Sequence, residues 1–103
     1  MGRAMLHTVN KSPFEHRSLE TCLKFAQPGN AVLLIEDGVY AAARETAVSR
    51  QVQDALKSLA IYALKPDVEA RGMQDRVMDG IRLVDYEGFV DLVVEHNAVQ
   101  SWL

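Results

Sequence analysis

The chain has 103 residues, of which 49% are hydrophobic and 24% charged, and its formal net charge is -3. This length fits one domain, and the acidic balance argues against a protein that holds nucleic acid through phosphate contacts, which needs a basic patch. A single cysteine excludes an intrachain disulfide and a multi-cysteine zinc site. No apolar run could span a bilayer and no signal peptide is evident, so we expect a cytoplasmic protein without membrane contact.

The first half of the chain alternates between strand and helix patterns. Residues 6–9 predict a short strand, Ser12-Pro13 predicts a helical turn, and residues 18–26 have the apolar spacing of a helix that Pro28-Gly29 ends. Residues 31–35 are apolar without alternation, which is typical of a strand covered on both faces in a parallel sheet.

The second half continues this alternation. The expected elements are a helix that begins near Val39 and restarts around Val48, a strand at 60–64, helical turns at 66–71, a strand at 81–84, and a helix at 86–96. Asp85 is expected to cap the last helix, with Phe89, Val90 and Val93 facing inward. The tail, residues 99–103, adds an edge strand or docks as a coil.

Strands alternating with helices predict an α/β fold. We expect a three-layer sandwich around a mainly parallel sheet of four or five strands, with the strands joined by right-handed crossovers. Residues 6–103 form the single expected domain, and residues 1–5 are an N-terminal extension or the start of the chain.

Cys22 is the only thiol and the first candidate catalytic residue. A cysteine that carries sulfur needs exposure and a lowered pKa. Its helical neighbours three and four positions away carry no basic group, and its place late in the helix disfavours a thiolate. The local residues therefore favour a buried packing role, unless Lys11, His16 or a partner chain activates the thiol.

The histidines and acidic residues offer weaker candidates. His7, His16 and His96 show no metal-ligand spacing, so we expect no metal site; His7 fits a core or interface position, and His96 fits the end of a helix. Glu36 and Asp37 follow an apolar strand, where a carboxylate pair could perform acid–base chemistry. The favoured alternative is structural: Asp37-Gly38 forms a turn and helix cap, and Asp67 and Asp85 cap helices in the same way.

No phosphate-binding glycine loop is present, so we expect no cofactor and no self-contained active site. Trp102, next to the end of the chain, either closes over the core or anchors a subunit contact. Removal of residues 100–103 is therefore expected to weaken assembly and to leave the fold of the monomer intact.

Several pieces of the sequence, in order and over nearly the whole chain, resemble the DsrH/TusB family of sulfur-relay subunits. The pieces are LHTVNKSPF at 6–14, VLLIEDGVYA at 32–41, YAL at 62–64 with Asp67, ARG at 70–72, VDY at 84–86 with GFVDL at 88–92, and QSWL at 100–103. The resemblance implies a DsrE-like α/β fold and a cytoplasmic heterohexamer that relays sulfur as a cysteine persulfide. It implies DsrE/TusD-like and DsrF/TusC-like partner subunits, and carrier proteins of the TusA and DsrC/TusE types.

The resemblance leaves two hypotheses. In a DsrH-type subunit for dissimilatory sulfur oxidation, Cys22 carries the sulfur: its thiolate attacks a donor persulfide and later releases the sulfur to an acceptor thiol. Cys22 and the Ser-Trp-Leu ending favour this branch. In a TusB-type subunit of the relay for 2-thiolation of the tRNA wobble uridine, the chain is a docking subunit without its own sulfur-carrying cysteine. In either case we expect no direct contact with nucleic acid.

Overall fold

The computed structural model describes residues 4–103; residues 1–3, part of the expected extension, lie outside this range. The strands are β1 (Met5–Val9), β2 (Ala31–Leu34), β3 (Ala60–Leu64), β4 (Arg82–Val84) and β5 (Ala98–Trp102). The helices are α1 (Ser18–Phe25), the 3-10 helix η1 (Glu36–Ala42), α2 (Ser49–Ala55), α3 (Lys65–Ala70) and α4 (Tyr86–Glu95). Met5 already belongs to β1, where it pairs with Ala98.

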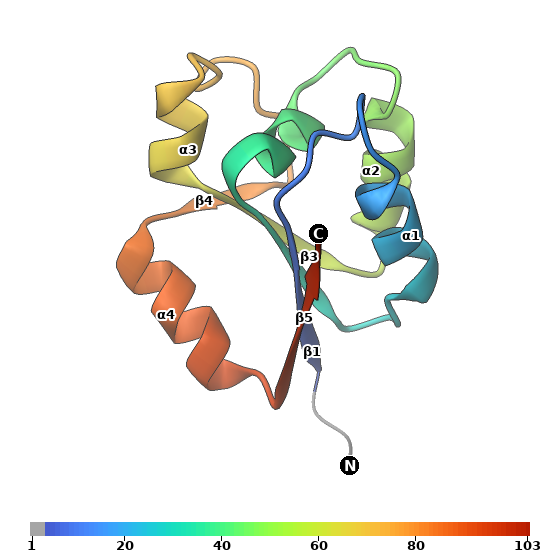
Figure 1. The fold of residues 1–103 in the computed structure, drawn as a ribbon, viewed down its shortest axis with the longest axis vertical. Coiled ribbons are helices and arrows are strands. Elements are labelled where there is room, and N and C mark those ends of the chain that lie inside the picture. Colours follow the sequence, from blue (N-terminus) through green and yellow to red (C-terminus); the bar gives the residue numbers. More distant parts are fainter. Residues whose placement is uncertain (1–3) are drawn as a thin grey trace.

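The five strands form one parallel sheet with the order β4-β3-β2-β1-β5. From β1 to β4 the chain moves one strand at a time in one direction, and the intervening helices lie on one face. The connection from β4 to β5 returns to the opposite edge of the sheet. Because parallel crossovers are right-handed, reversing the direction places α4 on the other face, as Figure 1 shows. The fold is therefore the expected three-layer α/β sandwich.

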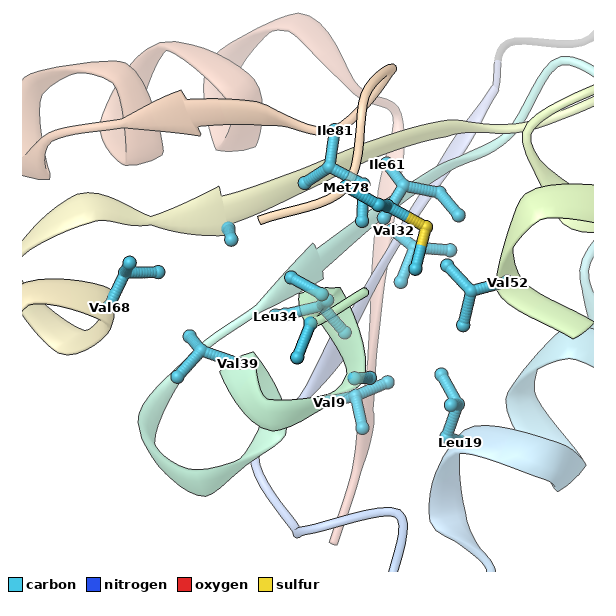
Figure 2. Close-up of a cluster of buried hydrophobic side chains, with 14 of the residues drawn as sticks. Val9, Leu19, Val32, Leu34, Val39, Val52, Ile61, Val68, Met78 and Ile81 are labelled. Atoms are coloured by element: carbon cyan, nitrogen blue, oxygen red, sulfur yellow. The ribbon is translucent and has the colours of Figure 1, made fainter. Parts of the chain in front are cut away.

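The main core fills the space between the sheet and α1, η1, α2 and α3. Side chains from alternate positions of the strands, such as Val9, Val32 and Ile61, meet Leu19 of α1 and Val52 of α2 (Figure 2). These residues are almost entirely removed from solvent. The unbroken apolar pattern of β2 is explained by this layer on one face and α4 on the other.

The opposite face of the sheet has a much smaller core. Leu6, Ala31 and Leu33 from the strands pack with Leu92 of α4, and Phe89 lies at its margin. α4 is the only helix of residues 4–103 that contributes to this core, so this layer covers less of the sheet than the main core does.

Most predicted elements are confirmed, and the differences are local. The expected helix near Val39 is a 3-10 helix that begins at Glu36, and the tail is an edge strand paired with β1. The prediction that Val90 and Val93 face inward is wrong, because Leu92 and Phe89 occupy the inner face of α4 and Val90 is 60% exposed. Periodicity alone could not choose between these faces, since both are apolar.

Candidate functional site

Cys22 lies in α1 on the side that faces the sheet, within the main core. Its exposed fraction is 0%, and Leu19, one turn earlier, is buried with it. The periodicity of α1 predicted such a buried cysteine, and the structure has one. In the isolated chain, no donor molecule can reach the sulfur without a local opening of the core.

Burial also determines the protonation of this thiol. Desolvation raises the pKa of Cys22 to about 12, because the thiolate loses its hydration in the core. A thiol that attacks a persulfide must be deprotonated near neutral pH. The surroundings of Cys22 therefore act against this chemistry in the free subunit.

The raised pKa predicts an alkaline loss of stability that depends on Cys22. In the unfolded chain this thiol titrates near its ordinary value of 9.0, whereas in the folded chain it holds its proton up to about pH 12. Between these values the unfolded state binds fewer protons, so the free energy of unfolding falls by up to about 1.4 kcal/mol per pH unit. Below pH 9 this contribution is fully present.

Urea unfolding of the wild type and of Cys22→Ala across this pH range tests the prediction. Other groups also titrate here, so the meaningful quantity is the difference in slope between the two proteins. Equal slopes would mean that the thiol is accessible to solvent in the folded chain.

The acidic residues at the carboxyl ends of the strands link neighbouring elements. Asp37 does not cap η1; its Oδ1 accepts hydrogen bonds from Nε and Nη2 of Arg71 at 3.1 and 2.8 Å. Asp67 accepts a 2.7 Å hydrogen bond from the backbone N–H of Glu36, a residue with φ of 50°. Asp85 caps α4 as predicted, through the N–H of Gly88. The capping prediction is therefore correct for Asp85 and wrong for Asp37 and Asp67, since Asp67 lies inside α3, whose N-cap is Leu64, and bonds to another element instead.

The ion pair between Asp37 and Arg71 occupies the carboxylate that the sequence offered for acid–base catalysis. The hydrogen bond to Asp37 raises the pKa of Arg71 further, so the guanidinium keeps its charge. The Arg71 guanidinium also lies 5.9 Å from the ring centre of Tyr40. Asp37 and Tyr40 line an open depression of about 440 Å³ together with Ser12, Phe14 and Glu15. Asp37 thus serves a structural contact to Arg71, while Glu36 is held to Asp67 through its backbone N–H.

His7 is buried, as the sequence predicted for a core position, and it has two polar partners that the sequence did not predict. Trp102 donates from Nε1 to Nδ1 of His7 at 3.1 Å, and Nε2 of His7 lies 2.9 Å from Oδ1 of Asn30. Because an indole N–H can only donate, Nδ1 of His7 must accept. Nε2 therefore carries the hydrogen and donates it in a hydrogen bond to Oδ1 of Asn30. This network connects the first strand to the last, and explains why His7 can be completely buried.

The other histidines take structural positions. His96 follows α4, and its Nδ1 lies 2.6 Å from the carbonyl oxygen of Leu92. His16 is exposed in the turn before α1. Within residues 4–103, no three histidine, cysteine or acidic side chains converge in a way that could hold a metal ion. No helix among the same residues has the length and apolar character to cross a membrane.

The fold is that of a known group of small α/β proteins. The ychN protein from E. coli superposes with a TM-score of 0.80 at 17% identity, covering 98% of this chain and 99% of that chain. Protein MTH1491 from Methanobacterium thermoautotrophicum gives a TM-score of 0.69 at 19% identity, with the same coverage. At these identities the likeness shows the fold alone.

The sequence comparisons show the family. The family model described as "DsrH like protein" matches residues 11–99. Protein TusB of Pectobacterium parmentieri is 40% identical over 99 residues, which is 95% of this chain and 100% of that protein. Protein TusB of Photorhabdus laumondii is 36% identical over 98 residues, with the same coverage. The chain belongs to the DsrH/TusB family of sulfur-relay subunits.

Within the family, these relatives support the TusB alternative better than the DsrH branch that sequence analysis favoured. The two features behind that preference were Cys22 and the Ser-Trp-Leu ending. In the structure, Cys22 packs in the core and Trp102 holds β5 against β1. Both residues therefore have a role in the fold that is independent of persulfide chemistry.

Proposed function

We propose that this chain is a TusB-type structural subunit of a cytoplasmic sulfur-relay complex that supplies 2-thiolation of the tRNA wobble uridine. Its partners are TusD-like and TusC-like subunits, with carriers of the TusA and TusE types. Sulfur passes as a persulfide between cysteines of the partners, and this chain carries none of it. The likeness to TusB proteins over 95% of the chain supports the branch.

The single observation that carries the structural role is the burial of Cys22. The only thiol of the chain has no exposed surface, and its pKa is raised to about 12. No other residue of the chain can form a persulfide. The net charge of -3 supports the view that a downstream enzyme, not this subunit, holds the tRNA.

Intact mass spectrometry of the assembled complex tests this proposal. We expect that after exposure to a persulfide donor a partner subunit gains the mass of sulfur and this chain does not. A complex with Cys22→Ala should load its partner equally and support the same level of tRNA thiolation. Alanine is the suitable replacement because a serine hydroxyl would be buried without a partner at a cost of about 1–3 kcal/mol.

The control is the same chain unfolded in denaturant, in which the donor must modify Cys22. Sulfur on the wild-type chain of the folded complex, combined with loss of relay in Cys22→Ala, would overturn the structural role and favour the DsrH-type carrier. Salt-dependent binding of tRNA by the isolated subunit would contradict the assignment of RNA binding to another protein.

A further inference from the structure

The apolar surface of α4 is wider than the part of it that packs within this chain. With 3.6 residues per turn, Phe89 and Leu92 share the inner face that contacts the sheet. Tyr86, Val90 and Val94 follow one another at intervals of four and form a row on the outer side, named here the α4 apolar row, and Val93, which is 39% exposed, lies between this row and the inner face. A helix at the surface of a soluble domain usually has an apolar stripe no wider than the face it packs on the core, so the exposed part of this wider stripe indicates burial against another molecule.

The α4 apolar row is well exposed. The exposed fractions are 61% for Tyr86, 60% for Val90 and 77% for Val94. Tyr86 and Val90 also line an open depression of about 400 Å³ together with Glu87 and Asp91. Isolated exposed apolar residues are common, but a continuous row beside a depression is a feature of interaction sites.

The charges next to this row indicate what kind of partner fits. Glu87, Asp91 and Glu95 form a second row at intervals of four, the α4 acidic row. Residues 85–103 contain no lysine or arginine, and none of the salt bridges found in residues 4–103 involves this row. Like charges four residues apart destabilise a helix, and basic groups on a partner would relieve this repulsion.

We infer that the outer face of α4 docks one of the partner subunits of the relay complex, through an apolar surface bordered by lysine or arginine side chains. This inference rests on the proposed function, and it identifies the surface through which the chain joins the relay complex. A second copy of the chain fits less well, because pairing two such faces brings two acidic rows into one interface.

The outer face of α4 is separated from the core around Cys22 by the sheet. α4 stands on one side of the sheet, and α1, which carries Cys22, stands on the other (Figure 1). Substitutions on the α4 apolar row can therefore change docking while the thiol remains as it is. This separation allows docking and sulfur transfer to be tested with different variants.

The test is the affinity of the full chain for its co-expressed relay partners at low ionic strength. Val90→Asp should weaken binding at least about tenfold, because it places an unpaired charge at the centre of the buried row. Val94→Ser removes apolar area without adding a charge and should weaken binding to a smaller extent. Asp91→Lys should weaken binding most at low salt, when its repulsion of a basic border is least screened. Glu69→Lys, an exposed reversal on α3, is the matched control and should bind like the wild type.

Thermal unfolding of each isolated variant establishes that the fold is intact. If Val90→Asp and Val94→Ser bind as tightly as the wild type, the inference is wrong and the proposed function stands. If Asp91→Lys alone is without effect, the inference that the partner presents lysine or arginine side chains beside this face is wrong. A homodimer of the isolated chain that Val90→Asp dissociates would assign the face to a second copy instead. If the wild-type chain forms no complex with relay subunits, the proposed function fails, and the inference fails with it.

Discussion

Replacing Gly38 with alanine should destabilise the chain by about 3 kcal/mol or more, a larger effect than the same replacement would have at any other glycine of residues 4–103. A Cβ atom at this position would lie 2.1 Å from the carbonyl oxygen of Val9 and 2.8 Å from its carbonyl carbon. These are backbone atoms of β1, which is held between β2 and β5 and cannot rotate away. The same oxygen accepts the hydrogen bond from the N–H of Ile35 at 3.0 Å, so a shift of η1 would also strain this contact.

Gly72→Ala is the matched control for this prediction. Gly72 has a φ of 63°, but an added Cβ would meet no atom within 4 Å. The cost is then only that of the left-handed backbone, about 1 kcal/mol. Denaturant unfolding followed by far-UV circular dichroism measures both variants. If Gly38→Ala costs no more than Gly72→Ala, then η1 does not approach β1 as closely as the structure has it.

Trp102→Ala should destabilise the monomer by about 3 kcal/mol, because the variant loses both packing and a buried hydrogen bond. The indole packs against the main core and lies 5.6 Å from the ring of Phe25. Its Nε1 supplies the donor to Nδ1 of His7, which is completely buried and would be left without a partner. Since Trp102 pairs with Val9 at the end of β5, the edge strand is expected to loosen as well.

Trp102→Phe separates the two contributions, since it keeps most of the packing and removes the donor. We expect this variant to lose about 1–2 kcal/mol. Trp102 is the only tryptophan, so its fluorescence in the wild type also reports whether the tail is docked. An alanine variant as stable as the wild type, with a solvent-exposed emission spectrum in the parent, would mean that β5 does not pair with β1 in solution.

The same contacts change the expectation for a tail deletion. The sequence alone predicts that removal of residues 100–103 weakens assembly and leaves the fold of the monomer intact. In the structure these residues supply part of β5 and the partner of His7. The deletion should therefore lower the stability of the monomer, and a loss of assembly in that variant would not identify an interface. The outer face of α4 is a better place to test docking, because its side chains do not pack within the chain.

Local patterns identified most elements of the fold for a clear reason. The apolar runs at 31–35 and 60–64 have few alternatives to buried parallel strands, and Asp85 caps α4 through a contact only three residues away. α4 is the instructive exception, since its inner and outer faces are both apolar. Only packing against Leu6 and Leu33 decides that Leu92 turns inward and Val90 outward.

For the candidate site, the sequence by itself determined the family, the single thiol and the burial that α1 periodicity imposes on Cys22. Only the tertiary structure decided the partners of the polar residues: Asp37 with Arg71, Asp67 with the backbone of Glu36, and His7 with Trp102. The physical reason is distance along the chain. Periodicity and capping depend on neighbours within about four residues, whereas His7 and Trp102 are 95 residues apart and meet only because β5 returns beside β1.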